Sequence, residues 1–199
     1  TATGWYRYST TDPGTCDNSF GTSTATTALG AGTAPVAFPR AISGLTPGAT
    51  YYFCAIASNT YGYGYGAVMT FTTPFAAPVV STGTPSPVTG TTATLNGSAN
   101  PGGDATTGWF RYSTSSPGTC NDSFGTRAPA SGGSALGSGT ANVPFSQAIT
   151  GLTANTTYYV CAIAQNSVAP GVGSVVTFTT PAIPTVTTSA ASAIAATTA

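Results

Sequence analysis

Apolar and polar residues alternate along the chain in short runs that end at clusters of glycine and proline. In residues 77–181 this alternation predicts six strands, and no segment has the helical spacing of apolar positions. A series of short strands with turn signals between them is typical of an all-β sandwich. The predicted strands are residues 79–82, 91–98, 107–113, 143–149, 156–166 and 175–179.

The strand pattern occurs more than once, because the chain contains an internal repeat of about 105 residues. GWYRYST at residues 4–10 recurs at 108–114, CAIA at 54–57 recurs at 161–164, and the tail from 184 aligns with the segment from 78. These matches predict three parts. They are residues 1–76, a domain that lacks its first two strands; residues 77–181, a complete domain; and residues 182–199, the first strand or strands of a third unit, or a donor strand for a neighbouring subunit.

The shortened first unit leaves two interpretations open. In the first, the sequence is a window on a longer tandem array. In the second, the tail of one subunit fills the gap in the next subunit by strand addition, although such a tail lacks the apolar counterpart of Leu95. Both interpretations predict a repeating polymer in which units follow one another head to tail.

Four stretches, TATLNGSANPGG, TTGWFRYST, AITGLTANTTYYVCAIAQNS and VVTFTTP, resemble a fibronectin type III domain of the bacterial extracellular kind. The resemblance implies tandem fibronectin type III or immunoglobulin-like sandwiches. It also implies that Tyr51 and Tyr158 are tyrosine-corner residues, whose hydroxyls bond to backbone upstream. The tryptophan common on the family's second strand is absent. Pro39 and Pro144 fall in the fifth strand, which should therefore be a sheet edge, as in the family.

The four cysteines allow three disulfide pairings. The repeat favours Cys16 with Cys54 and Cys120 with Cys161, because each unit then closes on itself. Disulfides are typical of oxidising compartments, and we therefore predict an extracellular or cell-surface location.

Alternation also predicts which residues lie beneath these disulfides. If Tyr51 points into the core, Cys54 points to the opposite face of its sheet, together with Trp5 and Arg7. We interpret Trp5 and Arg7, and their counterparts Trp109 and Arg111, as structural residues, with a cation–π contact from Arg7 to Trp5. The alternative is that the two tryptophans bind carbohydrate.

Charge is the unusual feature of the composition. Only 4% of the residues are charged, as four arginines and four aspartates, and the net charge is zero. This balance gives no electrostatic attraction to nucleic acid or to an anionic membrane, and it tolerates self-association. No apolar run approaches the roughly 18 residues of a membrane span. We predict no nucleic-acid partner and no membrane insertion.

Catalytic and metal-binding groups are scarce. Histidine is absent, and neither lysine nor glutamate is present to activate a serine, threonine or cysteine nucleophile. We therefore predict no catalytic residue, no enzymatic activity and no cofactor. Asp12, Asp17 and Asn18 have the oxygen atoms that calcium prefers, but so few carboxylates favour turn formation, and we predict no metal site.

Two kinds of surface feature suggest contacts. YGYGYG at residues 61–66 alternates tyrosine with flexible glycine, which predicts a contact loop formed by Tyr61, Tyr63 and Tyr65. Sequons for N-glycosylation begin at Asn96, Asn121 and Asn155.

Together these features predict a structural subunit of an extracellular filament or surface fibre, built of β-sandwich repeats in head-to-tail series. Its main partners would be copies of itself, joined end to end and side by side. The alternative is an adhesin or spacer module of a larger secreted or surface protein, with glycans as the ligand.

Overall fold

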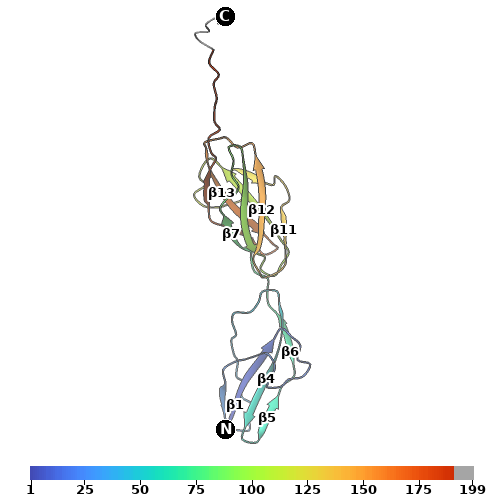
Figure 1. Cartoon of the computed structure of the whole chain (residues 1–199). Helices are drawn as coiled ribbons and strands as arrows, with labels where there is room; N and C mark the ends of the chain where they lie inside the picture. Colours follow the sequence, from blue (N-terminus) through green and yellow to red (C-terminus); the bar gives the residue numbers. More distant parts are fainter. Residues whose placement is uncertain (191–199) are drawn as a thin grey trace, which may run out of the picture.

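A computed structural model of the chain describes residues 1–190, and the regular structure in them is entirely β-strand. The strands form two domains arranged end to end, so that the molecule is a rod (Figure 1). The N-terminus lies at the far end of the first domain, and residues 182–190 extend from the opposite end of the second domain (Figure 1). The fold is a tandem array of antiparallel β-sandwich units, as the sequence predicts.

The second domain has two sheets. One has the order β12-β8-β7, and the other is built around the pair β9 and β13. The first sheet contains β7 (Val79–Gly83), β8 (Thr92–Asn100) and β12 (Val143–Thr150). The second sheet contains β9 (Thr106–Ser113), β10 (Thr126–Ala128), β11 (Ser134–Gly137), β13 (Thr157–Gln165), β14 (Pro170–Val172) and β15 (Val176–Thr179).

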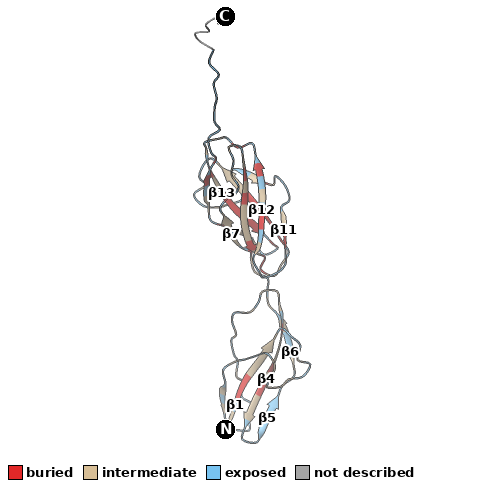
Figure 2. Ribbon diagram, in the orientation of Figure 1, coloured by how far each residue is buried: buried red, intermediate tan, exposed pale blue. Residues whose placement is uncertain are grey.

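A hydrophobic core lies between these two sheets. Leu95 of β8 is 0% exposed, Phe110 of β9 is 1% exposed, and Val160 of β13 is 0% exposed. The buried positions are concentrated in the second domain, whereas the first domain is mostly partly buried or exposed (Figure 2). The second domain is therefore a complete sandwich with its own core.

All six strands predicted for the second domain are present, with ends shifted by one or two residues. Pro144 lies in β12, at the edge of the sheet, as predicted from the missing backbone donor. The sequence pattern missed β10, β11 and β14, because TRA, SALG and PGV do not alternate apolar with polar residues over enough positions to show a period of two.

The first domain has a single sheet in the described chain. It contains β1 (Ala2–Ser9), β2 (Thr22–Ser23), β3 (Thr27–Gly30), β4 (Thr50–Asn59), β5 (Gly62–Tyr65) and β6 (Met69–Thr72). These strands correspond to the sheet of β9 and β13, and the described chain has no counterpart of β7 and β8 in this domain. Only one half of a sandwich is therefore present.

The segment 36–43, VAFPRAIS, matches VPFSQAIT in β12, but it has no regular secondary structure. In the second domain the backbone of β12 pairs along its whole length with β8. Without a counterpart of β8, residues 36–43 have no ladder to join, and the predicted fifth strand containing Pro39 does not form.

The junction between the domains is fastened by backbone and side-chain contacts. Ala76 N donates to Gly102 O at 2.9 Å, and the buried Asn166 amide donates to Ala76 O at 2.7 Å. Phe75 lies against Gly48 of the first domain and Gly103 of the second. These contacts tie the linker to both domains and favour a stiff connection.

Candidate interaction surface on the first domain

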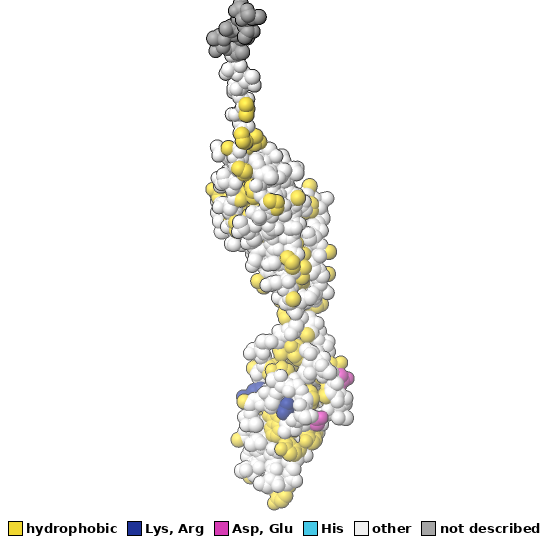
Figure 3. Space-filling view, in the orientation of Figure 1, with side chains coloured by type: hydrophobic (Ala, Val, Ile, Leu, Met, Phe, Trp, Pro, Cys, Tyr) yellow, Lys and Arg dark blue, Asp and Glu magenta, His cyan; other side chains and the backbone are white. Residues whose placement is uncertain are grey.

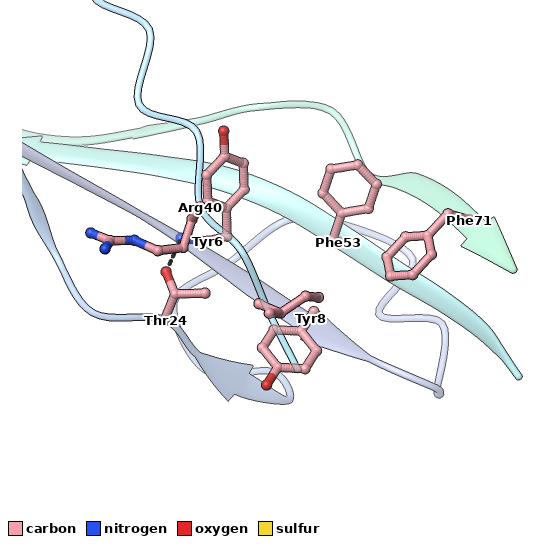
Figure 4. Close-up of a pocket in the computed structure, with 7 residues that line it drawn as sticks. Tyr6, Tyr8, Thr24, Arg40, Phe53 and Phe71 are labelled. Atoms are coloured by element: carbon pink, nitrogen blue, oxygen red, sulfur yellow. Dashed lines mark hydrogen bonds between the residues drawn. The ribbon is translucent and has the colours of Figure 1, made fainter. Parts of the chain in front are cut away.

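An aromatic groove lies on the sheet face of the first domain that would face a second sheet. Tyr6 and Tyr8 of β1, Phe53 of β4 and Phe71 of β6 line it, and its volume is about 310 Å³ (Figure 4). The remaining lining residues are Thr24, Arg40 and Ile42. Hydrophobic side chains gather on the visible face of this domain, with the few charged groups around them (Figure 3). We call this feature the aromatic groove.

The aromatic side chains of the groove are ordered by contacts among themselves. The rings of Phe53 and Phe71 meet edge to face at 5.8 Å between centroids, and Tyr51 stacks on Phe71 at 5.6 Å. Tyr6 also lies against Phe38 of the irregular segment, at 5.1 Å. The groove is thus preformed in the isolated chain, which lowers the entropic cost of filling it.

The corresponding positions in the second domain are buried. Phe110 takes the place of Tyr6, Val160 that of Phe53, and Ile149 that of Ile42. In the second domain the sheet of β7, β8 and β12, to which Ile149 belongs, covers Phe110 and Val160, and in the first domain the same positions remain partly exposed. The groove is therefore the core of a sandwich with one sheet absent, and its opening reflects missing strands rather than different residues.

Glycines mark the course of a strand beside the groove. In the second domain a Cβ on Gly171 would lie only 2.0 Å from Pro78 O, and one on Gly173 would lie 2.4 Å from Thr82 Oγ1. Both residues are glycine because β7 passes directly over them. Their counterparts Gly64 and Gly66 face no such strand, since a Cβ on Gly64 would have Ala57 O at 4.0 Å as its nearest neighbour.

The tyrosines of the YGYGYG segment point to the other side of the sheet. Tyr63 meets Trp5 edge to face at 6.2 Å and stacks on Tyr65 at 6.1 Å. Tyr61, at the tip of the hairpin, is 97% exposed. Alternation thus gives this segment two faces, with tyrosine over the disulfide cluster and glycine beside the aromatic groove.

The disulfide cluster is a second, smaller core on the outer face of each sheet. The structure contains the disulfides Cys16–Cys54 and Cys120–Cys161, which close each domain on itself. Trp5 and Ile56 are buried beneath the first disulfide, and Trp109 occupies the same place in the second domain. Both tryptophans pack in the interior, so neither is available as a flat carbohydrate-binding ring.

Hydrogen bonds complete this cluster in both domains. Trp5 Nε1 donates to Asn18 Oδ1 at 3.1 Å, and Trp109 Nε1 donates to Asp122 Oδ1 at 2.7 Å. Arg111 Nε forms an ion pair with the same carboxylate at 2.9 Å. The arginine that stacks on a tryptophan is Arg127, 4.6 Å above the Trp109 ring.

The cation–π contact expected of Arg7 is thus replaced by hydrogen bonds. Arg7 Nη1 donates to the carbonyl of Phe20 at 3.1 Å and to that of Gly21 at 3.2 Å. The planar guanidinium of Arg7 donates hydrogen bonds to these two loop carbonyls. These bonds hold the loop that carries Cys16 over Trp5.

The carboxylate of Asp122 makes the second domain sensitive to acid. Burial raises the pKa of Asp122, but hydrogen bonds from Arg111 and Trp109 outweigh it and hold that pKa below its ordinary value of 3.8. A carboxyl whose folded-state pKa is depressed stabilises the fold above its unfolded pKa, and this stabilisation disappears as the pH falls through the folded value. Asp122 therefore contributes stability at neutral pH that is lost in acid.

We expect Asp122→Asn to flatten the acid dependence of the second domain. Between pH values of about 5 and about 2, the melting temperature of this domain should fall less in the variant than in the parent chain, because the amide does not titrate. Calorimetric unfolding at several pH values measures this difference. Identical acid dependence in the two proteins would contradict the assigned role of Asp122.

Both tyrosines assigned to the tyrosine corner accept a backbone hydrogen bond five residues upstream. Thr46 N donates to Tyr51 Oη at 3.0 Å, and Thr153 N donates to Tyr158 Oη at 2.9 Å. The bond from Thr46 lowers the pKa of the Tyr51 phenol. These bonds fix the crossover into the long central strand of each domain, β4 and β13.

The three sequons lie in different environments. Asn96 is engaged, because its amide donates to the carbonyls of Thr84 at 3.2 Å and Ser86 at 3.3 Å. Asn121 closes a turn by accepting from Ser123 N at 2.9 Å. Asn155 is exposed in a turn with φ of 52°. Of the three, Asn155 is the position most open to a modifying enzyme.

Asp12 and Asp17, whose carboxylates have the oxygen atoms that calcium prefers, both form turns. Asp12 Oδ1 accepts from Gly14 N at 2.8 Å, and Asp17 Oδ1 accepts from Ser19 N at 2.6 Å. Hydrogen bonds from Ser19 lower the pKa of Asp17. Within residues 1–190 no three metal-ligating side chains gather in one place.

In the same residues, no helix has the length and apolar character needed to cross a membrane.

No family model and no curated protein matches this chain. Among solved structures, the sensor domain of the anti-sigma factor RsgI4 of Pseudobacteroides cellulosolvens is similar at 20% identity with a TM-score of 0.38, over 57% of this chain and 99% of that one. The FN1–FN3 domains of chicken CNTN1 are similar at 14% identity with a TM-score of 0.32, over 90% of this chain and 56% of that one. Both likenesses are weak, so the architecture rests on the strands and sheets described above.

The aromatic groove is the feature that reading the sequence did not identify. The repeat identifies the strands that the first unit lacks, but alternation along the chain does not show which side chains those strands would cover. The alignment of the two units contains the signal, because Tyr6 and Phe71 align with Phe110 and Phe178, core residues of the second domain in the sheet opposite β7, β8 and β12.

Proposed function

We propose that the chain is a structural subunit of an extracellular filament or surface fibre, in which copies join head to tail. The observation that carries this proposal is the aromatic groove, a preformed sandwich core that the described chain leaves uncovered on a sheet face of the first domain. An exposed apolar surface of this kind is typical of an interaction site. Its counterpart within the same chain is filled by protein strands, which favours another protein segment as the ligand.

The composition supports the same function. A net charge of zero and a charged fraction of 4% leave little repulsion between copies. The junction fastened by Asn166 and Phe75 suits a load-bearing rod better than independently moving modules. Intradomain disulfides are typical of an oxidising compartment, which supports a location outside the cell.

We expect the purified chain to form fibres. Negative-stain electron microscopy should show filaments whose axial repeat corresponds to one or two domains, and sedimentation velocity should show a mass that rises with concentration. Particles that stay monomeric at every concentration tested would contradict the filament function.

The second candidate is an adhesin or spacer module, and it depends on the exposed tyrosine at the hairpin tip. Tyr61 lies beside a shallow hollow that Tyr63 and Asn59 also line. Aromatic rings beside amide groups are able to contact a sugar through both stacking and hydrogen bonds. Monomers that bind glycans, and lose this binding in Tyr61→Ala, would favour this function over a filament.

A further inference from the structure

We propose that the segment beginning at Pro184 in one copy of the chain packs on the open sheet face of a second copy's first domain, beside the aromatic groove and over Gly64 and Gly66, in the position that β7 holds in the second domain. This inference rests on the filament function and specifies the contact that joins its subunits. The described part of the segment, residues 184–190, is exposed and extends from the end of the rod opposite to the groove (Figure 1). Donation therefore takes place between copies.

The sequence of the tail matches the strands that fill the second domain. Val186 aligns with Val80, which packs against the core, and Thr188 aligns with Thr82. Farther along, Ile194 aligns with Val88, another residue packed on that core. Ile194 lies outside the described residues, so this match rests on sequence alone. The inward apolar positions of β7 and of the turn after it thus recur in the tail.

The acceptor domain retains the backbone features that receive such a strand. In the second domain Thr82 Oγ1 accepts from Ala162 N at 3.0 Å, across the sandwich. Ala55 is the counterpart of Ala162, and Gly64 and Gly66 are the counterparts of the glycines over which β7 passes. A donated tail would bring Thr188 to the Ala55 N–H and lay its backbone over the two glycines. In the isolated domain Gly64 has no packing neighbour that requires a glycine, whereas a Cβ on Gly66 would already lie 3.2 Å from Ala55 O.

A matching asparagine lies where the donor would enter. In the second domain Asn166 donates to Ala76 O, in the linker that leads into β7. Its counterpart in the first domain is Asn59, which is exposed and has the same turn contact, accepting from Tyr61 N at 2.8 Å. The linker of the donor copy, around Ala182 and Ile183, would supply the carbonyl that Asn59 meets. End-to-end contact between copies would then repeat the junction between the two domains.

The donor side is tested by two aspartate substitutions one residue apart. Val186→Asp places a charge on the face turned toward the acceptor sheet, because its counterpart Val80 packs against the core, whereas Thr185→Asp is the matched control, because its counterpart Val79 is 70% exposed. We expect Val186→Asp to weaken self-association at least about tenfold, since a buried unpaired charge is costly, and Thr185→Asp to leave it nearly unchanged. Equal effects of the two substitutions in sedimentation equilibrium would overturn the inference.

The acceptor side is tested by adding one methyl group. Gly64→Ala meets nothing closer than 4.0 Å in the isolated domain, but its Cβ would collide with a strand lying as β7 does. We expect the variant to fold normally and to associate at least about tenfold more weakly. Gly32→Ala is the control in the same domain, because a Cβ there has open space and no strand is expected to pass.

Mixing the two variants distinguishes strand donation from lateral association, because only strand donation predicts a complex of defined size. Val186→Asp retains an intact groove, and Gly64→Ala retains an intact tail, so the mixture should form one junction and stop as a one-to-one heterodimer. Full fibres from either variant alone would overturn strand donation while leaving the filament function intact.

The remaining case is a parent chain that stays monomeric, which removes the filament function. Strand donation is then decided by titrating the monomer with a synthetic peptide of residues 184–199 and following the Ala55 amide by NMR. A saturable shift that the Val186→Asp peptide does not produce would support the contact, and no shift at millimolar peptide would overturn it. A peptide of residues 78–100, which carries both β7 and β8, is the positive control for an open groove.

Discussion

Replacement of Cys16 and Cys54 by serine is expected to unfold the first domain and leave the second domain folded. The buried hydrophobic residues of the first domain are Trp5, Tyr51, Cys54 and Ile56, and the disulfide holds the loop that covers three of them. The disulfide closes a loop of 38 residues, which corresponds to about 4 kcal/mol of stabilisation. That amount is comparable to the whole free energy of unfolding of a small domain, and this domain has an open second face.

The matched control is the same pair of substitutions at Cys120 and Cys161. The loss of loop closure is similar, with a separation of 41 residues, but the second domain has a large core between its sheets. We expect this variant to melt at a lower temperature and to remain folded at 25 °C. Amide NMR spectra, recorded in a Val186→Asp background to prevent association, report the two domains separately. Retention of a folded first domain without its disulfide would show that the aromatic groove supplies more stability than we infer.

Leu95→Ala is expected to destabilise the second domain by about 2–5 kcal/mol. Leu95 is fully buried and belongs to the hydrophobic core, to which both sheets contribute side chains. Truncation removes buried apolar surface and leaves a cavity between sheets that other strands hold apart. Denaturant unfolding of the second domain measures the change.

Val79→Ala is the control for Leu95→Ala, because Val79 lies in the same sheet but is exposed. Its truncation should change the free energy of unfolding by less than about 0.5 kcal/mol. The tail of the chain has no counterpart of Leu95. A small effect of Leu95→Ala would therefore indicate that a sandwich of this type does not need the Leu95 side chain, and it would strengthen donation by a tail that lacks it. A large effect predicts that a peptide of residues 78–100 binds the groove more tightly than the tail does.

The irregular segment 36–43 shows how the same pattern leads to two structures. Its apolar residues Val36, Phe38 and Ile42 recur in β12 as Val143, Phe145 and Ile149. In β12 they form a strand because β8 supplies the backbone partners. In the first domain Phe38 still packs on Tyr6, so the side-chain preference survives, but the strand does not form.

The sequence by itself determined the features that depend on neighbours along the chain or on the repeat. Period-two alternation predicted six strands of the second domain and their inward faces, and the repeat predicted the disulfide pairing that the structure contains. It also predicted that Trp5 and Trp109 lie beneath the disulfides. These properties follow from local geometry, because a side chain's face is set as soon as its strand is extended.

Only the tertiary structure decided which surfaces are covered. The open aromatic groove, the irregular state of residues 36–43 and the role of Asn166 at the junction all depend on strands distant in sequence. The same is true of Gly171 and Gly173. A side chain at either position would collide with the backbone or side chains of residues 78–82, and this conflict exists only because that segment lies over them. Backbone hydrogen bonding and burial in a sheet are satisfied by partners distant in sequence, so a similar segment differs in structure when its partner strand is absent.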